Sequence, residues 1–149
     1  MDRYVWSGLN HLQIGRYAEY FVKMEFTMLG YDVYGAEVDD QGIDFVIRRS
    51  GKRCYDIQVK SVRGWNYIFF PKSKFTLRSN LLAALVVFFD GQMPQLYLIP
   101  SMDWDTPNEL LVNRDYEGKK SQPEWGLNLS QRNLSLLTKY QFSEVVQKL

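Results

Sequence analysis

The pattern of apolar and polar positions predicts one long helix followed by a series of strands. Between residues 9 and 29, apolar side chains recur near the 3.6-residue period of a helix, and Gly30 stands where a helix C-cap belongs. Shorter segments with strand character follow at 31–37, 43–48, 53–62 and 95–99. The segment 65–70 also reads as extended, whereas 77–89 fits either a helix running into a strand or a strand alone.

The remaining segments are polar or helical and complete a single predicted domain over residues 1–149. A polar turn is predicted at 39–42, and a polar, proline-containing stretch runs over 103–123. A C-terminal helical region opens at Leu129, with Ser130 as its N-cap. The chain contains no internal repeat and no interdomain linker. We therefore expect an α/β fold with a mixed sheet and helices at both ends of the sequence.

Two of the predicted strands flank the Ser50–Gly51 turn and place polar side chains on one surface. If the two strands pair across a three-residue loop, Asp44 lies opposite Gln58. A register shifted by one residue would instead bury Asp44 beside Ile57, so the alternation favours the first register. That register brings Asp44, Gln58 and Lys60 together.

A carboxylate, an amide oxygen and an ammonium group are suited to holding a divalent cation against a phosphodiester. Taken singly, the three residues have ordinary explanations as a turn acid, a strand amide and an edge lysine. Glu19 lies four residues after Gly15 on the long helix, and it would join them if that helix face meets the hairpin. His11 shares the stripe and is typical of a helix surface.

Composition is ordinary for a globular protein, with 46% hydrophobic and 23% charged residues. Cys54 is the only cysteine, which excludes an intramolecular disulfide and fits a reducing, cytoplasmic setting. The first ten residues have no apolar signal core, and the longest apolar run, 81–89, is too short for a membrane-spanning helix. We therefore expect no membrane association. Glycine-rich nucleotide-binding motifs are absent from the sequence.

The net charge of +1 conceals an uneven distribution of charge. The segment 48–78 carries nine cations and a single acid, Asp56, for a net +8, while the rest of the chain carries −7. Such a segment is typical of a surface for a polyanion, although a solvated face of an interaction protein would look the same. Besides Lys60, its cations are the candidate DNA-binding residues: Arg48, Arg49, Lys52, Arg53, Arg63, Lys72, Lys74 and Arg78.

In the order of these residues, the chain resembles the PD-(D/E)XK nuclease superfamily. The matching positions are Glu19 in GRYAE, Asp44 in GIDFVI and Gln58-Val59-Lys60 in DIQVKS. The resemblance implies a restriction-endonuclease-like core, a mixed central sheet flanked by helices, in the order α-β-β-β-(α)-β-β before the C-terminal helical region. Ile43 replaces the proline, and Gln58 replaces the acid of the (D/E) position. The small group I intron homing endonucleases can carry glutamine there, whereas junction-resolving members usually keep glutamate.

The resemblance implies hydrolysis of duplex DNA by a homing-type endonuclease that uses Mg²⁺ or Mn²⁺. Asp44, Gln58, Glu19 and the backbone carbonyl of Val59 would be the metal ligands, and Lys60 would orient the water or stabilise the transition state. A Holliday-junction-resolving or repair nuclease is the alternative enzyme. Because glutamine brings no charge to the metal, a catalytically inactive DNA-binding module is a further alternative. One site per chain and two DNA strands predict a homodimer or homotetramer.

Overall fold

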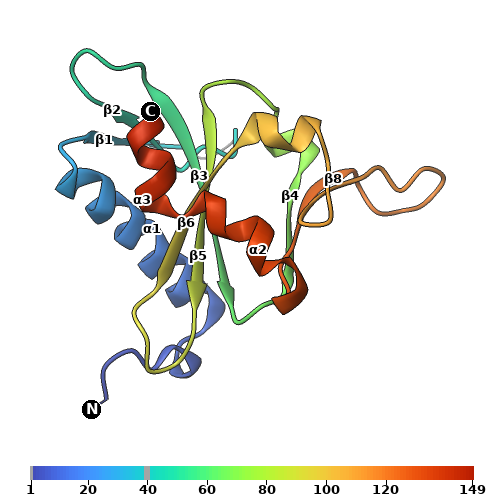
Figure 1. Ribbon diagram of the computed structural model, residues 1–149, viewed down its shortest axis with the longest axis horizontal. Coiled ribbons are helices and arrows are strands. Elements are labelled where there is room, and N and C mark those ends of the chain that lie inside the picture. Colours follow the sequence, from blue (N-terminus) through green and yellow to red (C-terminus); the bar gives the residue numbers. More distant parts are fainter. Residues whose placement is uncertain (1, 39–40) are drawn as a thin grey trace.

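A computed structural model describes residues 2–38 and 41–149 and contains two β-sheets (Figure 1). The central sheet is mixed, as predicted, because β3 and β5 are parallel while the other neighbours are antiparallel. Its five strands have the order β1-β2-β3-β5-β6. They are β1 (Asp32–Gly35), β2 (Phe45–Arg48), β3 (Tyr55–Arg63), β5 (Leu81–Phe88) and β6 (Gln95–Pro100).

Helix α1 (His11–Met28) confirms the long helix and packs against β1, β3 and β5. A capping box starts it, because Asn10 Oδ1 accepts from the Gln13 N–H while Gln13 Oε1 accepts from the Asn10 N–H. The φ of +85° at Gly30 ends the helix in the left-handed conformation that glycine favours. The buried side of α1 carries Ala18, Val22 and other apolar residues, which hold the helix on the sheet.

β5 explains why the segment 77–89 was ambiguous in the sequence. All eight of its residues are buried between β3 and β6, so the strand shows no alternation of polar and apolar positions. The strand-alone interpretation is therefore confirmed. The antiparallel partner β6 was predicted within one residue of its observed end.

A second sheet with the order β4-β8-β7 corrects the predicted element order. The extended segment 65–70 is β4 (Tyr67–Pro71), but it pairs with β8 (Glu124–Asn128) rather than with the central sheet. In the chain, β4 and the 3₁₀ helix η2 (Lys72–Lys74) take the place of the helix that stands in parentheses after the third strand of the predicted order. β7 (Leu111–Arg114) and β8 were missed because each is only four or five residues long, in or beside a stretch of polar residues.

Short helices complete the chain, as predicted for the C-terminal region. They are η4 (Gln131–Asn133), α2 (Leu134–Leu137), η5 (Thr138–Tyr140), α3 (Phe142–Val145) and η6 (Val146–Lys148). Ser130 precedes η4, but its side chain makes no capping hydrogen bond. Gln141 bridges to Tyr97 at the edge of β6, and the ring of Phe142 lies 5.2 Å from that of Phe26 on α1.

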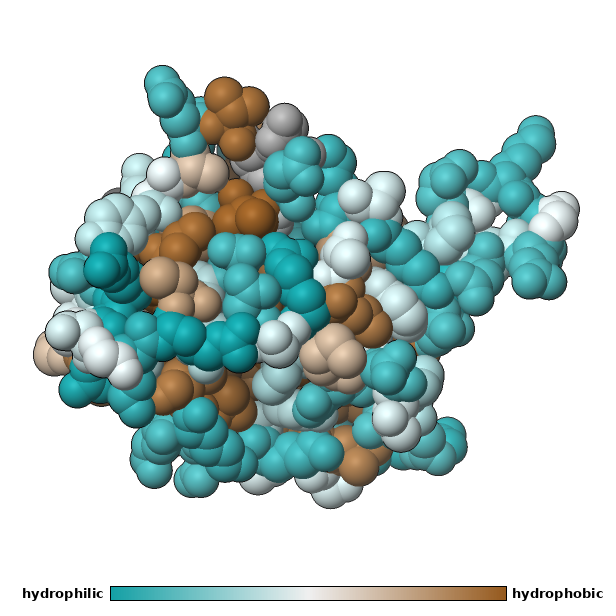
Figure 2. Space-filling model, turned by 90° about the horizontal axis from the view of Figure 1, so that it is seen from above, coloured by the Kyte–Doolittle hydropathy of each residue, from teal (hydrophilic) through white to brown (hydrophobic). Residues whose placement is uncertain are grey.

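Two further 3₁₀ turns, η1 (Trp6–Gly8) and η3 (Ser101–Asp105), flank the core. The loop between β7 and β8 projects from the body of the molecule and is hydrophilic (Figure 2). Of the predicted turn at 39–42, residues 39 and 40 lie outside the described residues. In the described part of the chain, no helix has the length and apolar character needed to cross a bilayer.

Candidate active site

The β2–β3 hairpin has the register that the alternation of its side chains predicts. Val46 pairs with Asp56, and Phe45 pairs with Ile57. The Asp44 N–H donates to the carbonyl of Ile57 over 2.9 Å, and continuing the register by one residue places Asp44 opposite Gln58. The predicted apolar face is confirmed, because its four central residues are buried: Phe45, Ile47, Tyr55 and Ile57.

Asp44 lies immediately before β2, where the backbone of β3 continues beyond its partner strand. The N–H of Val59 donates to Asp44 Oδ2 over 2.6 Å, which fixes the carboxylate against β3. In an extended strand the N–H and the C=O of one residue point to the same neighbouring strand. The carbonyl of Val59 therefore points to the side of β3 on which Asp44 lies.

An open pocket of about 270 Å³ joins this end of the hairpin to helix α1. Asp44, Val59 and Ser61 line it from the hairpin, and Glu19 faces it from α1. The helix face that carries Glu19 therefore meets the hairpin, which is the condition under which Glu19 joins Asp44. Glu19 also forms an ion pair with Lys23, at 3.1 Å between Oε1 and Nζ. The remaining lining comes from α1 and consists of His11, Leu12, Gly15 and Arg16.

Gln58 is held on the other side of β3 and is 9% exposed. With its amide nitrogen turned towards the neighbouring carbonyls, Nε2 donates to Gly42 O at 3.0 Å and to Lys74 O at 3.2 Å. Gly42 must be glycine, because its φ is +76° and a Cβ would lie 2.3 Å from the Lys74 carbonyl oxygen. Gln58 thus ties the loop before β2 to η2, and only its Oε1 remains for a cation.

Lys60 lies on the same side of β3 as Gln58, with Nζ 5.4 Å from the centre of the Phe70 ring. Burial lowers the pKa of the Lys60 ammonium, while the charge of Asp44 acts in the opposite direction. Lys60 and Asp44 are therefore electrostatic neighbours. The side chains of Gln58 and Lys60 do not line the pocket that contains Glu19.

The donors gathered here suit a hard divalent cation. Within residues 2–38 and 41–149, no cluster of three or more His, Cys, Asp or Glu side chains could hold a metal ion. Asp44 and Glu19 nevertheless bring two carboxylates to one pocket, and the carbonyl of Val59 adds a neutral oxygen. Carboxylate and carbonyl oxygens are the ligands that Mg²⁺ prefers, with water completing the shell.

The candidate DNA-binding residues near the β2–β3 turn are exposed. The turn is surrounded by four cations, Arg48, Arg49, Lys52 and Arg53. Arg48 follows Asp44 by four residues, or about 13 Å along β2. Arg53 donates from Nη2 to Ser79 Oγ at 3.1 Å, and its guanidinium lies 5.4 Å from the centre of the Tyr55 ring. The turn therefore presents positive charge to solvent, at a distance from the pocket.

The later candidates contact the protein itself. Arg63 Nη1 donates to the carbonyl of Leu9 at 2.6 Å, and Lys72 Nζ pairs with Asp115 at 2.6 Å. Arg78 Nη2 pairs with Asp56 Oδ2 at 2.7 Å. Lys74 has an exposed side chain, while its carbonyl accepts from Gln58. A role of these residues in binding DNA stays a prediction.

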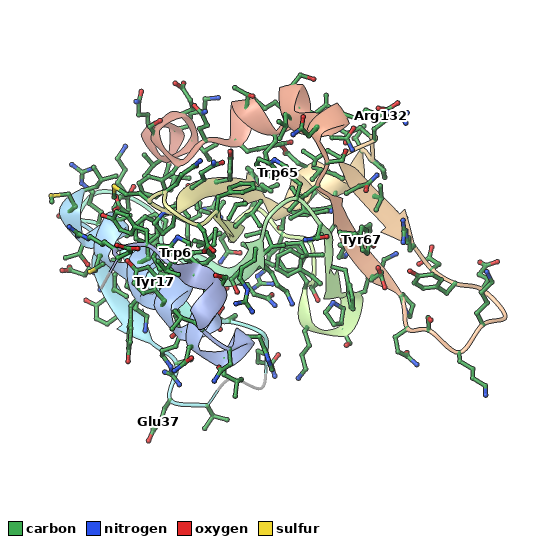
Figure 3. The ribbon with its side chains drawn as sticks, turned by 90° about the horizontal axis from the view of Figure 1, so that it is seen from below. Trp6, Tyr17, Glu37, Trp65, Tyr67 and Arg132 are labelled. Carbon is green, nitrogen blue, oxygen red and sulfur yellow. The ribbon has the colours of Figure 1, made fainter. Side chains whose placement is uncertain are left out.

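Most aromatic residues among these cations pack within the protein, as the strand pattern predicted, whereas Phe69 is 44% exposed. Phe70 is fully buried and stacks on Phe75 at 4.2 Å. The ring of Trp65 packs edge-on against Phe89 at 5.1 Å. Figure 3 shows Tyr67 on the second sheet, on the opposite side of the molecule from α1. Packing accounts for Phe70 and Trp65 without any stacking on nucleic-acid bases.

Arg16 and Ser61 line this site but were not predicted from the sequence. Ser61 follows Val59 by two, so strand alternation could have placed both on the pocket side. Arg16 lies next to Gly15 on α1, but nothing in its spacing separates it from other surface arginines. The contact of Gln58 with Lys74 depends on the path of β4 and η2, which sequence periodicity does not reveal.

The fold is similar to that of a solved nuclease. The 1.6 Å structure of Hjc, a Holliday junction resolvase from the archaeal hyperthermophile Archaeoglobus fulgidus, superposes with a TM-score of 0.56. The alignment covers 91% of this chain and 97% of Hjc at 13% sequence identity. This likeness fits the restriction-endonuclease-like core implied by the PD-(D/E)XK resemblance. The sequence matches no protein-family model and no curated protein.

Proposed function

We propose that the protein is a divalent-metal-dependent endonuclease that hydrolyses phosphodiester bonds in DNA. The observation that carries this proposal is the meeting of Asp44, Glu19 and the Val59 backbone at one pocket, with Lys60 beside Asp44. These groups come from three separate stretches of the chain. Their order and types match the pattern that suggested a nuclease, and the fold similarity to a DNA resolvase supports the same chemistry.

Glu19 and Asp44 would hold Mg²⁺ or Mn²⁺ as the charged ligands, with the Val59 carbonyl and Gln58 Oε1 as neutral oxygen ligands. When bound, the metal supplies a more acidic water and neutralises charge that builds up on the phosphate. The hydrogen bond from Val59 holds Asp44 in place before any ligand arrives. The two backbone contacts of Gln58 hold the loop that precedes Asp44.

Lys60 would act on the reacting phosphate or on the attacking water through its ammonium group. Its position against Phe70 excludes water from one side of the amine, and a charge in such surroundings acts more strongly than in bulk solvent. The nearby carboxylate of Asp44 favours the charged form of Lys60. Lys60 thus contributes electrostatic stabilisation where negative charge develops.

Two DNA substrates are supported by different observations. The similarity to Hjc, which extends over 91% of this chain, supports a branched DNA junction. Small size and a glutamine at the (D/E) position support a homing-type duplex substrate. Because Gln58 has a structural role on the Gly42 and Lys74 carbonyls, its presence no longer favours the homing type by itself. We therefore place the junction first and duplex DNA second.

The number of subunits is part of the proposal. Each chain contributes one such pocket, and cleavage of both strands requires two, so we propose a homodimer or homotetramer. Light scattering of the protein alone and with DNA tests this. A monomer under both conditions would contradict the assembly and leave only single-strand nicking by each chain.

The decisive experiment incubates the protein and Mg²⁺ with a four-way junction and with long duplex DNA, beside Asp44→Ala and Lys60→Ala variants. We expect cleavage by the wild type and none by either variant. Cleavage that both variants retain would contradict the site assignment. Salt-dependent binding without cleavage would identify a silent DNA-binding module, and the absence of DNA binding would favour an interaction protein.

A further inference from the structure

Gly15 lies in the interior of helix α1 at the wall of the Glu19–Asp44 pocket, and nothing within the protein requires a glycine there. Glycine at an interior helix position lowers helix stability relative to alanine. A Cβ added at Gly15 would meet no atom within 4 Å, and its backbone has no left-handed φ. Neither packing nor backbone conformation therefore explains this glycine.

Gly42 and Gly126 have an internal explanation, which makes the contrast with Gly15 informative. A Cβ on Gly42 would lie 2.3 Å from Lys74 O, and a Cβ on Gly126 would lie 2.2 Å from Tyr67 Oη. At those positions the protein itself occupies the space. At Gly15 the space is part of the open pocket. The pocket volume of about 270 Å³ equals that of about nine water molecules.

The two side chains beside this space are suited to a phosphate. His11 and Arg16 line the pocket from the same helix, and both carry N–H donors. Among the described residues, no hydrogen bond or ion pair is formed by the His11 side chain, and Arg16 only lies 6.0 Å from the Tyr20 ring. Both donors are therefore available to an incoming ligand.

We propose that the surface formed by His11, Gly15 and Arg16 is a subsite for the sugar-phosphate backbone next to the phosphate that is cleaved. Gly15 leaves room for the backbone to approach α1, and the donors of His11 and Arg16 bind its phosphate. This inference rests on the proposed nuclease function and adds a binding surface to it. Because Glu19 and Asp44 would hold the cation, the phosphate contacts fall to His11 and Arg16, which precede Glu19 on α1.

The proposal predicts opposite effects on stability and on DNA binding at one position. Gly15→Ala should raise the melting temperature by about 2–4 °C, because alanine favours the helix and meets no neighbour. The same substitution should weaken DNA binding roughly tenfold, since the added methyl group displaces a charged phosphate contact. Gly15→Leu, with similar helix propensity and more bulk, should weaken binding further.

Two matched controls accompany these variants. Thr27→Ala replaces an exposed threonine on the same helix, whose Oγ1 donates to the Lys23 carbonyl, with the better helix former. Because such back-bonding does not stabilise a helix, the variant should raise the melting temperature and leave DNA binding unchanged. Arg16→Gln should lower affinity and reduce the salt dependence by about one phosphate contact. Arg132→Gln, on the far side of the molecule from α1 in Figure 3, should do neither.

Binding is measured by fluorescence anisotropy on a labelled four-way junction in Ca²⁺, and stability by thermal unfolding without DNA. If Gly15→Ala melts higher but binds and cleaves as the wild type does, the subsite is wrong while the nuclease function stands. A Gly15→Ala protein that melts lower would contradict the empty space on which the inference depends. If wild-type protein neither binds nor cleaves DNA, the proposed function itself is wrong.

Discussion

The two sides of β3 differ in what covers them. On one side, Val59 and Ser61 line an open pocket with Glu19 of α1. On the other side, Gln58 is closed off by the Gly42 and Lys74 carbonyls, and Lys60 lies against Phe70. Asp44 belongs to both sides, because it lines the pocket and is an electrostatic neighbour of Lys60.

Within residues 58–61 of β3, residues that line the ligand pocket therefore alternate with residues that contact the rest of the protein. The residue that replaces the acid of the PD-(D/E)XK pattern is a donor to two backbone carbonyls, which a carboxylate cannot be. We infer that residues facing the pocket can change with little effect on stability. Substitutions at Gln58 or Lys60, which face η2 and β4, should change both the stability of the protein and the position of Asp44.

Among the residues of β3, the largest expected effect comes from Lys60. Lys60→Met removes the ammonium and keeps the length of the side chain against Phe70, so we expect cleavage to fall by about 10²–10³-fold. Folding should be retained, because a partly desolvated charge is replaced by an apolar group. Single-turnover cleavage and thermal unfolding check both halves. A large loss of stability without a specific loss of cleavage would give Lys60 a structural role instead.

Gln58→Glu should cost stability, by roughly 2–4 kcal/mol at pH 8, because a carboxylate would face two carbonyl oxygens and leave them without a donor. The introduced carboxyl should have a raised pKa. Its penalty therefore shrinks as the pH falls through that pKa, since the protonated form can donate to one carbonyl. Urea unfolding at pH 8 and pH 5 measures this.

Gln58→Leu is the matched control for that change, since it removes the donor without adding a titrating group. Its loss of stability should be the same at both pH values. A Gln58→Glu protein that is as stable as the wild type at pH 8 and binds Mn²⁺ more tightly would contradict the comparison, because residue 58 would then face the metal.

The pH dependence of cleavage should follow the lowered pKa of Lys60. Burial makes the folded protein release this proton below the ordinary lysine value of 10.5. Between the folded and unfolded pKa values the unfolded chain binds more protons, so this group adds stability as the pH rises. Cleavage needs the charged form and should fall over the same range. Lys60→Arg should move the alkaline limit of the rate profile upward.

The smallest effect is expected on the open side. Ser61→Ala should change the free energy of unfolding by less than about 0.5 kcal/mol, because Ser61 borders a pocket rather than the core. Chemical denaturation provides the measurement. A loss above 2 kcal/mol would mean that the two sides of β3 are equally involved in packing.

The sequence predicted those parts of the fold that depend on local periodicity. The helix over 9–29, the hairpin register and the shared stripe of His11, Gly15 and Glu19 are all present. β5 could not be distinguished from a helix because both of its faces are buried. β8 forms through long-range pairing with β4, and β7 pairs with β8, for which their short segments carry no signal.

The sequence did not predict that Gln58 and Lys60 lie on the other side of β3 from the pocket lined by Asp44 and Glu19. Alternation placed Asp44 opposite Gln58 correctly. It gave no reason to expect that Gln58 binds Lys74, because η2 approaches only after the chain has passed through β4. Nothing in the sequence indicated that cations of the segment 48–78 pair within the protein, as Lys72 does with Asp115 and Arg78 does with Asp56.

The central claim is that the charge of Asp44 serves catalysis, and the rate at which Asp44→Asn cleaves a four-way junction in Mg²⁺ tests it most directly. Asparagine keeps an oxygen that can accept from the Val59 N–H, so the local structure should persist while the anionic ligand is lost. We predict a folded protein that binds the junction and cleaves it at least about 10³-fold more slowly than the wild type. Cleavage within a factor of about three of the wild-type rate would contradict the account.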